Sequence, residues 1–281
     1  MSVCGDQYIL FGSGVEHPPF KTHLLHTHER CEIFCCFRGS GYYITEGSRN
    51  RLERGRIFLM RPGEMHKIAP AGEEARETLA FHFDCALVER IDPELRLLAP
   101  FFDRPLGMHN IYDHGAVAPT EIYSLFQKMR EYEGCQEDRC AYLTAMLFPV
   151  LAELKRLFDA KAYSESGKSS QLMHTLIGYV NDNLSMELTP ELLCDKFHIS
   201  RTQLDRNFKS ATGSTVWAYI TAKRLLLAKA YIEDGMRITE AAGACGFRDY
   251  STFYRAYRKH FGMQPSEGAT SEAFPAAAFL K

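Results

Sequence analysis

Two different patterns of apolar positions divide the chain. From Leu24 to about Phe83, short apolar or alternating runs are separated by Gly, Pro and Asn residues. Alternation with a period of two, interrupted by turn-forming residues, is typical of short β-strands. The sequence therefore predicts an antiparallel β-barrel or sandwich in this part, with strands at Ile33–Phe37, Tyr42–Ile44, Ile57–Met60 and Leu79–Phe81.

Further along the chain the apolar residues recur every three or four positions. This spacing places them on one helix face and predicts amphipathic helices over residues 120–132 and 139–160. Pro149 should kink the second helix or mark where it restarts, because proline lacks a backbone donor. The second helix is apolar on more than one stripe, which a single packing partner would not require. We therefore expect the chain to dimerise through it.

Helical spacing continues after a polar, Ser-rich stretch at 163–171, which predicts a linker. The expected fold class is α+β with several domains, an antiparallel barrel with helices followed by an all-α part. The expected organisation is a barrel at 1–115, a helical dimerisation region at 116–162, the linker at 163–171, an all-α domain at 172–268 and a tail at 269–281.

One helical design occurs twice in the all-α part. A short helix, a tight turn and a longer helix with a polar face is how a protein places one helix in the DNA major groove. Ser200 and Gln203 form a capping box, and Gly246 suits the left-handed backbone of such a turn. The two units are 189–196, 197–199 and 200–210, and 239–244, 245–248 and 249–261.

Composition and charge change this picture little. A chain of 281 residues that is 46% hydrophobic and 24% charged fits a globular protein of about two domains. The net charge of −2 argues against a strongly basic nucleic-acid binder, although the balance differs between the two parts. Residues 1–168 hold 20 basic against 24 acidic side chains, and residues 169–267 hold 12 against 10.

Membrane and export features are not found in the sequence. No apolar run approaches the roughly 18 residues of a membrane span, and residues 1–14 lack the pattern of a secretory signal. We expect a cytoplasmic protein whose nine cysteines are reduced thiols that pack as small apolar residues. Cys35 and Cys36 should point to opposite faces of one strand.

The run from Ile238 to Pro265, ITEAAGACGFRDYSTFYRAYRKHFGMQP, resembles the signature of the AraC/XylS family of bacterial transcription regulators. Tyr257 stands where the family usually has Phe, and Ser-Glu-Gly follows Pro265 in place of the usual Tyr-Arg. The resemblance covers about residues 172–268 and extends back through Ser200, Leu204, Arg206, Phe208, Lys209, Gly213, Tyr219, Arg224, Leu225 and Ala228.

This resemblance implies two helix-turn-helix units joined by a rigid helix at about 216–232, with both second helices entering successive major grooves of double-stranded DNA. It implies phosphate contacts by Lys209, Arg258 and Lys259, which add affinity without sequence choice. The expected base-reading residues are Arg201, Thr202, Asp205 and Arg206 in the first unit, and Tyr250, Ser251, Thr252 and Arg255 in the second. Expected partners are DNA, a small-molecule effector and a second copy of the chain, with RNA polymerase as a further candidate.

A second resemblance lies in the N-terminal part. His26, His28, Glu32 and Gly39 have the spacing His-x-His-x3-Glu-x6-Gly, and His66 ends the run Pro-Gly-Glu-Met-His. This sequence pattern resembles the two motifs of the cupin barrel. In metal-binding cupins the corresponding four residues hold Fe, Mn, Ni or Zn, because imidazole and carboxylate groups suit such ions. Those residues are His26, His28, Glu32 and His66.

The AraC family commonly carries a cupin-like domain that senses a small molecule, frequently a sugar, without a metal. We therefore expect a one-component transcription regulator without bound cofactor or enzymatic activity. The expected ligand-binding residues are His26, His28, Glu32, Arg38 and His66, with Tyr42 or Phe34 stacking on the ligand.

Two points remain open at this stage. His82 lies between Phe81 and Phe83 and is expected to line the barrel outside the site. The alternative function is a metal-dependent cupin enzyme, or a metal sensor, fused to a DNA-binding domain, with a divalent metal at the cupin motif. The sequence contains no motif of a Ser-His-Asp triad, a P-loop or a dinucleotide site that would favour another enzyme class.

Overall fold

The computed structural model of the chain describes residues 2–5, 8–20, 25–46, 48–164 and 171–268. The chain forms two compact units, Met1–Lys168 and Ser169–Lys281, and each is described by itself. The division falls inside the stretch expected as a linker. Tyr163 and Ser164 of that stretch belong to the first unit, since Tyr163 stacks on His109 and the Ser164 N–H donates to Ile111 O at 2.8 Å. Most of the expected linker, and the tail at 269–281, lie outside the described residues.

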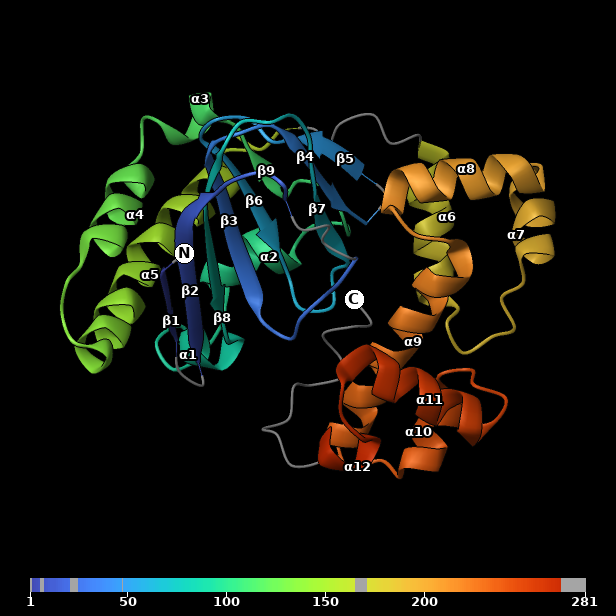
Figure 1. Cartoon of the computed structure of the whole chain (residues 1–281). Coiled ribbons are helices and arrows are strands. Elements are labelled where there is room, and N and C mark those ends of the chain that lie inside the picture. Colours follow the sequence, from blue (N-terminus) through green and yellow to red (C-terminus); the bar gives the residue numbers. More distant parts are fainter. Residues whose placement is uncertain (1, 6–7, 21–24, 47, 165–170, 269–281) are drawn as a thin grey trace. The chain divides into compact units, whose positions relative to one another are not determined.

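The N-terminal unit is built on two antiparallel sheets, as the alternating pattern predicts (Figure 1). The larger has the order β1-β2-β8-β3-β6-β9 and the smaller the order β5-β4-β7. The strands are β1 (Ser2–Gly5), β2 (Ile9–Glu16), β3 (Cys31–Arg38), β4 (Gly41–Thr45), β5 (Ser48–Arg51), β6 (Arg56–Met60), β7 (His66–Pro70), β8 (Arg76–Phe83) and β9 (Ile111–Tyr112). The four strands named from the sequence are β3, β4, β6 and β8, and the structure adds five others.

The larger sheet is buried on both faces because its strands alternate two sets of side chains. On β3, Cys31, Ile33 and Cys35 pack with the covering helices. Phe34 and Cys36 point the other way and pack in a second cluster with Tyr43 of the smaller sheet. Cys35 and Cys36 thus lie on opposite faces, both fully buried, as predicted. The eight cysteines with described side chains are all free thiols.

Helices α4 and α5 cover the outer face of the larger sheet (Figure 1). The helical segments of this unit are α1 (Cys85–Glu89), η1 (Arg96–Leu98), α2 (Ala99–Phe102), α3 (His114–Val117), α4 (Ile122–Glu131) and α5 (Gln136–Asp159). α5 continues through Pro149, so of the two expected effects of this proline the restart is excluded and the kink stays a prediction. Proline removes one hydrogen bond, and burial of the neighbouring Leu147, Val150 and Leu151 holds the helix in place.

The described residues of the C-terminal unit form helices joined by turns and loops, with no strand among them. Its helices are α6 (Gln171–Asp182), α7 (Pro190–Phe197), α8 (Arg201–Thr212), α9 (Val216–Glu233), α10 (Ile238–Ala244), α11 (Tyr250–Phe261) and α12 (Pro265–Gly268). The capping box at Ser200 and Gln203 is present and begins α8. Gly213 and Gly262 end α8 and α11 in the left-handed conformation, which glycine adopts without steric strain.

α9 is buried along most of its length because it packs against both helix-turn-helix units. Tyr219 near its start meets Phe208 of α8 edge to face at 5.4 Å. Leu225, Ala228 and Ile232 share an apolar cluster with α10 and α11.

Arg224 in the middle of α9 ties the two units together. Its guanidinium donates to Leu184 O at 2.8 Å and Met186 O at 2.6 Å, both before α7, and to Gly246 O at 2.9 Å in the second turn. Gly246 has φ +81°, and a Cβ there would lie 2.7 Å from Leu184 O. The predicted need for glycine at this position is confirmed.

Candidate functional site

The centre of the candidate ligand site is a carboxylate between the two sheets. Glu32 follows Cys31 on β3 and shares the inward face with Phe34. The register of β3 against β8 places His82 directly opposite Glu32. Cross-strand neighbours on one sheet face lie in contact range, and His82 Nε2 is 3.6 Å from Glu32 Oε2. The Glu32 side chain is only 6% exposed.

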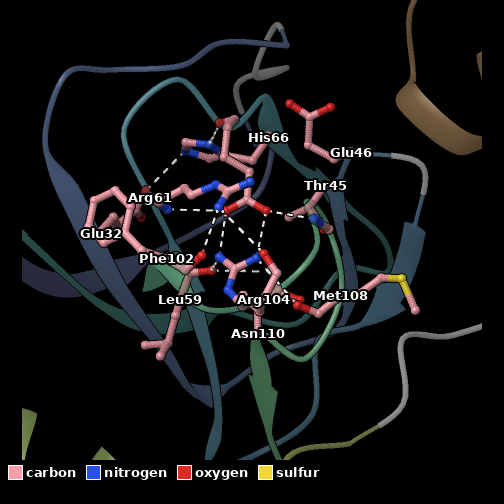
Figure 2. Close-up of polar contacts among 12 residues, drawn as sticks. Glu32, Thr45, Glu46, Leu59, Arg61, His66, Phe102, Arg104, Met108 and Asn110 are labelled. Atoms are coloured by element: carbon pink, nitrogen blue, oxygen red, sulfur yellow. Dashed lines mark hydrogen bonds and ion pairs between the residues drawn. The ribbon is translucent and has the colours of Figure 1, made fainter. Parts of the chain in front are cut away.

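Two more histidines approach the same carboxylate oxygen. His28, in the segment before β3, places its Nε2 2.9 Å from Glu32 Oε2. His66, at the start of β7 in the smaller sheet, places its Nε2 3.0 Å from that oxygen. Figure 2 shows His66 facing Glu32. We call Glu32, His28, His66 and His82 the Glu32 cluster.

Charge and burial oppose each other within this cluster. Burial alone would raise the pKa of Glu32, but positive charge on His66 and the hydrogen bond from His28 hold that pKa well below its usual range. Burial likewise works to lower the pKa of His66, and the Glu32 carboxylate more than offsets it, so the pKa is raised. For His82 burial dominates and lowers the pKa. The cluster therefore holds an ionised carboxylate in a nearly dry setting.

A buried ion pair, of which Figure 2 labels Arg104, fixes the loop that leads into β7 and His66. Arg104 donates to both oxygens of Glu64, at 2.9 and 2.6 Å, and both side chains are fully buried. Burial would raise the pKa of Glu64, but Arg104 lowers it to about 2. The Gly107 N–H donates to Glu64 at 2.7 Å, and the Glu64 carbonyl accepts from His66 Nδ1 at 2.8 Å. The pair thus holds the His66 ring in position.

The structure brings together three of the five expected ligand-binding residues, His28, Glu32 and His66. His26 pairs with His66 through the backbone, with ring centroids 4.5 Å apart, but His26 is exposed. Arg38 is exposed at the other end of β3, six residues and roughly 20 Å of strand from Glu32. The structure does not bring Arg38 into the cluster.

The aromatic neighbours also differ from the expected ones. Tyr42 is half-buried on β4 and lies under the Arg49 guanidinium, 3.7 Å from the ring centroid. Tyr43, which points the other way, is buried and stacks parallel to His66 at 5.9 Å. Phe34 is buried against Tyr43 in the apolar cluster. Tyr43 is the aromatic residue beside the Glu32 cluster, and the sequence analysis missed it.

The expectation that His82 lies outside the site is wrong. Its neighbours Phe81 and Phe83 belong to the helix-covered core, so strand alternation turns His82 to the opposite face, toward Glu32. The Phe-His-Phe alternation was the available signal. His28, Glu32 and His82 offer ligand atoms that all lie within 4.8 Å of one another, a set of two imidazoles and a carboxylate that suits a transition metal.

The second candidate site is formed by the exposed faces of α8 and α11. On α8 the five expected DNA-contacting residues, Arg201, Thr202, Asp205, Arg206 and Lys209, are all exposed, while Leu204 and Phe208 are buried. Arg201 donates to Asp205 at 2.9 Å and to Glu191 at 3.2 Å. The hydrogen bond that Arg201 donates to Asp205 raises the pKa of Arg201. Arg201 therefore has two acidic partners within the protein.

α11 repeats this arrangement with different side chains. Phe253 and Tyr257 face the core, and the Asp249 side chain caps the helix by accepting from the Thr252 N–H at 2.7 Å. Tyr257, where this sequence departs from the family pattern, therefore lies away from the exposed face. All six expected DNA-contacting residues of this helix are exposed, namely Tyr250, Ser251, Thr252, Arg255, Arg258 and Lys259.

Comparison with known proteins defines the class of protein. The profile of the AraC-like ligand binding domain matches residues 20–177, and that of a helix-turn-helix domain matches residues 193–270. The chain belongs to the AraC family and is a transcription regulator with an N-terminal ligand-binding domain and a C-terminal DNA-binding domain. The expected family and the expected role as a transcription regulator are confirmed.

Individual relatives are distant but extend over most of the chain. The HTH-type transcriptional activator RhaR of Enterobacter sp. (strain 638) is 24% identical over 245 residues, 85% of this chain and 84% of that protein. RhaR of Salmonella arizonae is 21% identical over 244 residues, 86% and 85% of the two chains.

Solved structures give two further likenesses. An apo ToxT variant from Vibrio cholerae has a TM-score of 0.42 and 12% identity, covering 94% of this chain and 97% of its own. The DNA-binding domain of the global transcriptional factor AdpA, in complex with a target DNA, has a TM-score of 0.32 and 28% identity over 33% of this chain and 85% of its own. Among the described residues, none of the helices has the length and apolar character needed to cross a membrane.

Proposed function

We propose that this regulator reads a specific DNA site through α8 and α11. The observation that supports this most directly is the repeated geometry, in which a tight turn precedes a helix that buries its apolar side and exposes a row of polar and basic residues. Arg206 and Arg255 suit bidentate contacts to guanine, and Lys209, Arg258 and Lys259 suit phosphate contacts. Thr202, Tyr250, Ser251 and Thr252 complete the base-reading set, together with the mutually paired Arg201 and Asp205.

We further propose that a small hydroxylated molecule, such as a sugar, binds at the Glu32 cluster and controls DNA binding. The carboxylate and imidazole groups can replace their hydrogen bonds to one another with hydrogen bonds to the hydroxyl groups of a ligand. His28, Glu32 and His66 support this proposal by their convergence, and His26 lies beside them. Regulation rather than catalysis is the proposed role, in keeping with relatives that are transcriptional activators.

A homodimer formed through α5, and contact with RNA polymerase, complete the proposal. Leu143, Leu147 and Leu154 of α5 are used by the core of their own unit, while Met146 and Phe148 remain partly exposed. Sedimentation of the full chain and of Met146→Lys tests the dimer. A monomeric wild type, or a variant as dimeric as the wild type, contradicts association through this face.

Selection of binding sites from random DNA with the purified full chain tests the DNA-reading proposal. We expect Arg206→Ala to lose about 1–3 kcal/mol on the selected site and to relax base preference at one position. Ser210→Ala, exposed on the same helix but outside the expected contact set, is the control and should bind as the wild type does. An equal loss by Arg206→Ala on selected and random DNA would show that Arg206 contacts only the backbone.

A further inference from the structure

Two histidine ring nitrogens of the Glu32 cluster hydrogen-bond to backbone carbonyl oxygens. His28 Nδ1 lies 2.7 Å from Arg30 O, and His66 Nδ1 lies 2.8 Å from Glu64 O. A carbonyl oxygen only accepts hydrogen bonds, so each Nδ1 carries a proton. In a neutral imidazole the other nitrogen, Nε2, then presents a lone pair, and both Nε2 atoms face Oε2 of Glu32.

Two Nε2 atoms thus lie close to one carboxylate oxygen, in a space where His66 is 2% exposed. His66 Nε2 lies 3.0 Å from Oε2 without a hydrogen-bond partner among the described residues. Imidazole nitrogen and carboxylate oxygen atoms gathered in this way suit a transition-metal ion. Histidines that ligate metals generally donate the other ring N–H to a carbonyl or carboxylate, as His28 does here to Arg30 O.

The residues whose ligand atoms converge differ from those of the cupin pattern. That pattern uses His26 and His66 with His28 and Glu32, but His26 is exposed at the edge of the smaller sheet. The ligand atoms within 4.8 Å of one another come from His28, Glu32 and His82. His66 meets the Glu32 carboxylate from the opposite sheet and can hold its orientation.

We propose that His28, Glu32 and His82 bind one divalent transition-metal ion, with His66 as the residue that positions Glu32. Two imidazoles and one carboxylate are a set used for iron(II) and related ions, and it leaves coordination positions open. The effector would occupy those positions, a part that rests on the function proposed above. Binding of the metal itself does not depend on it.

The test uses the full chain, freed of metal with a chelator and titrated with Co²⁺, whose visible absorption reports its ligands. Metal content after desalting is measured by mass spectrometry. We expect one Co²⁺ per wild-type chain and at least about 100-fold weaker binding by His82→Ala and Glu32→Gln. His26→Ala is the matched control, since it removes a histidine of the cupin pattern outside the converging set, and it should keep wild-type affinity.

Two results would overturn the proposal. The first is a wild-type chain that binds no Co²⁺, which would leave the Glu32 cluster as an ion-pair network. The second is loss of Co²⁺ in His26→Ala with retention in His82→Ala, which would favour the cupin ligand set. Binding of the selected DNA is measured on the same samples. A chain that binds DNA without metal binding refutes only the metal site, whereas one that binds metal without selecting DNA refutes only the proposed function.

Discussion

The two helix-turn-helix units share a backbone design and differ in the chemistry they expose. Both second helices begin at a side-chain cap, Ser200 or Asp249, and end at a left-handed glycine. On α8 an acidic residue, Asp205, binds the first arginine. α11 contains no acidic residue and exposes three basic ones with Tyr250. The common fold therefore positions both helices in the same way within their units. The exposed side chains determine what each helix contributes to DNA binding.

The two turns differ as well. The first turn places a non-glycine residue, His198, in the left-handed region at φ 52°, whereas the second uses Gly246 at φ 81°. The second turn packs against the backbone of another segment at Leu184 O and against the Arg224 guanidinium. The residue at this position of the second turn is thus constrained by its neighbours.

Gly246→Ala should break this comparison most strongly. Left-handed strain and a Cβ 2.7 Å from Leu184 O together are expected to destabilise the C-terminal unit by about 3 kcal/mol. Gly243→Ala is the control, because a Cβ on this exposed helical residue meets no atom within 4 Å. Urea unfolding, followed by hydrogen exchange in α9–α11 and by fluorescence of Trp217, the only tryptophan, measures both. Equal stability of the two variants would contradict the packed turn.

Arg255→Ala should have the next largest effect, a loss of about 1–3 kcal/mol on the selected DNA site. Arg255 is exposed on α11 and has no acidic residue within its own helix. Fluorescence anisotropy with the selected site and with single-base variants measures the loss and locates the base. If α11 only follows the DNA backbone, the loss will be the same on every sequence.

Lys259→Ala should weaken binding to all DNA sequences alike and lower the salt slope by about one. Lys259 is exposed near the end of α11, where it suits a phosphate contact. Anisotropy titrations at several salt concentrations measure the slope, with Lys209→Ala as the equivalent change on α8. Altered base preference in either variant would contradict the phosphate role.

Asp205→Asn is expected to change DNA affinity least, and the direction of that change distinguishes two roles of Asp205. If Asp205 mainly holds Arg201, its neutralisation releases that arginine, and binding should tighten by a few-fold at low salt. Glu191→Gln, the other partner of Arg201, should act in the same direction. Loss of affinity at one base position would instead support the expected reading of a base by Asp205.

How far the sequence predicts the fold depends on where the signal lies. The helix ends were predictable because their caps are local, as at Ser200, Gly213 and Gly262. β3 and β8 were predictable because apolar residues alternate within them. β2 was not, since Gly12, Ser13 and Gly14 interrupt its apolar pattern, and its pairing with β8 forms only in the folded chain.

The candidate ligand site was predictable in part for the same reason. The spacing of His28 and Glu32 is local and identifies both residues. His82 lies 50 positions from Glu32, and their contact depends on the register between β3 and β8. Arg104, which supports Glu64 from a distant loop, has no sequence signal. The pairing of Arg201 with Asp205 was not predicted, although residues four apart on a helix are neighbours and the spacing was a local signal for it.

The two-faced packing of β3 has a consequence for changes in chain length. Its odd-numbered residues enter the helix-covered core and its even-numbered residues face the smaller sheet. Removing or adding one residue between Glu32 and Phe34 would exchange the two faces on one side of the change. Insertions and deletions in this strand should therefore be far less tolerated than substitutions, and library designs should vary its residues at constant length.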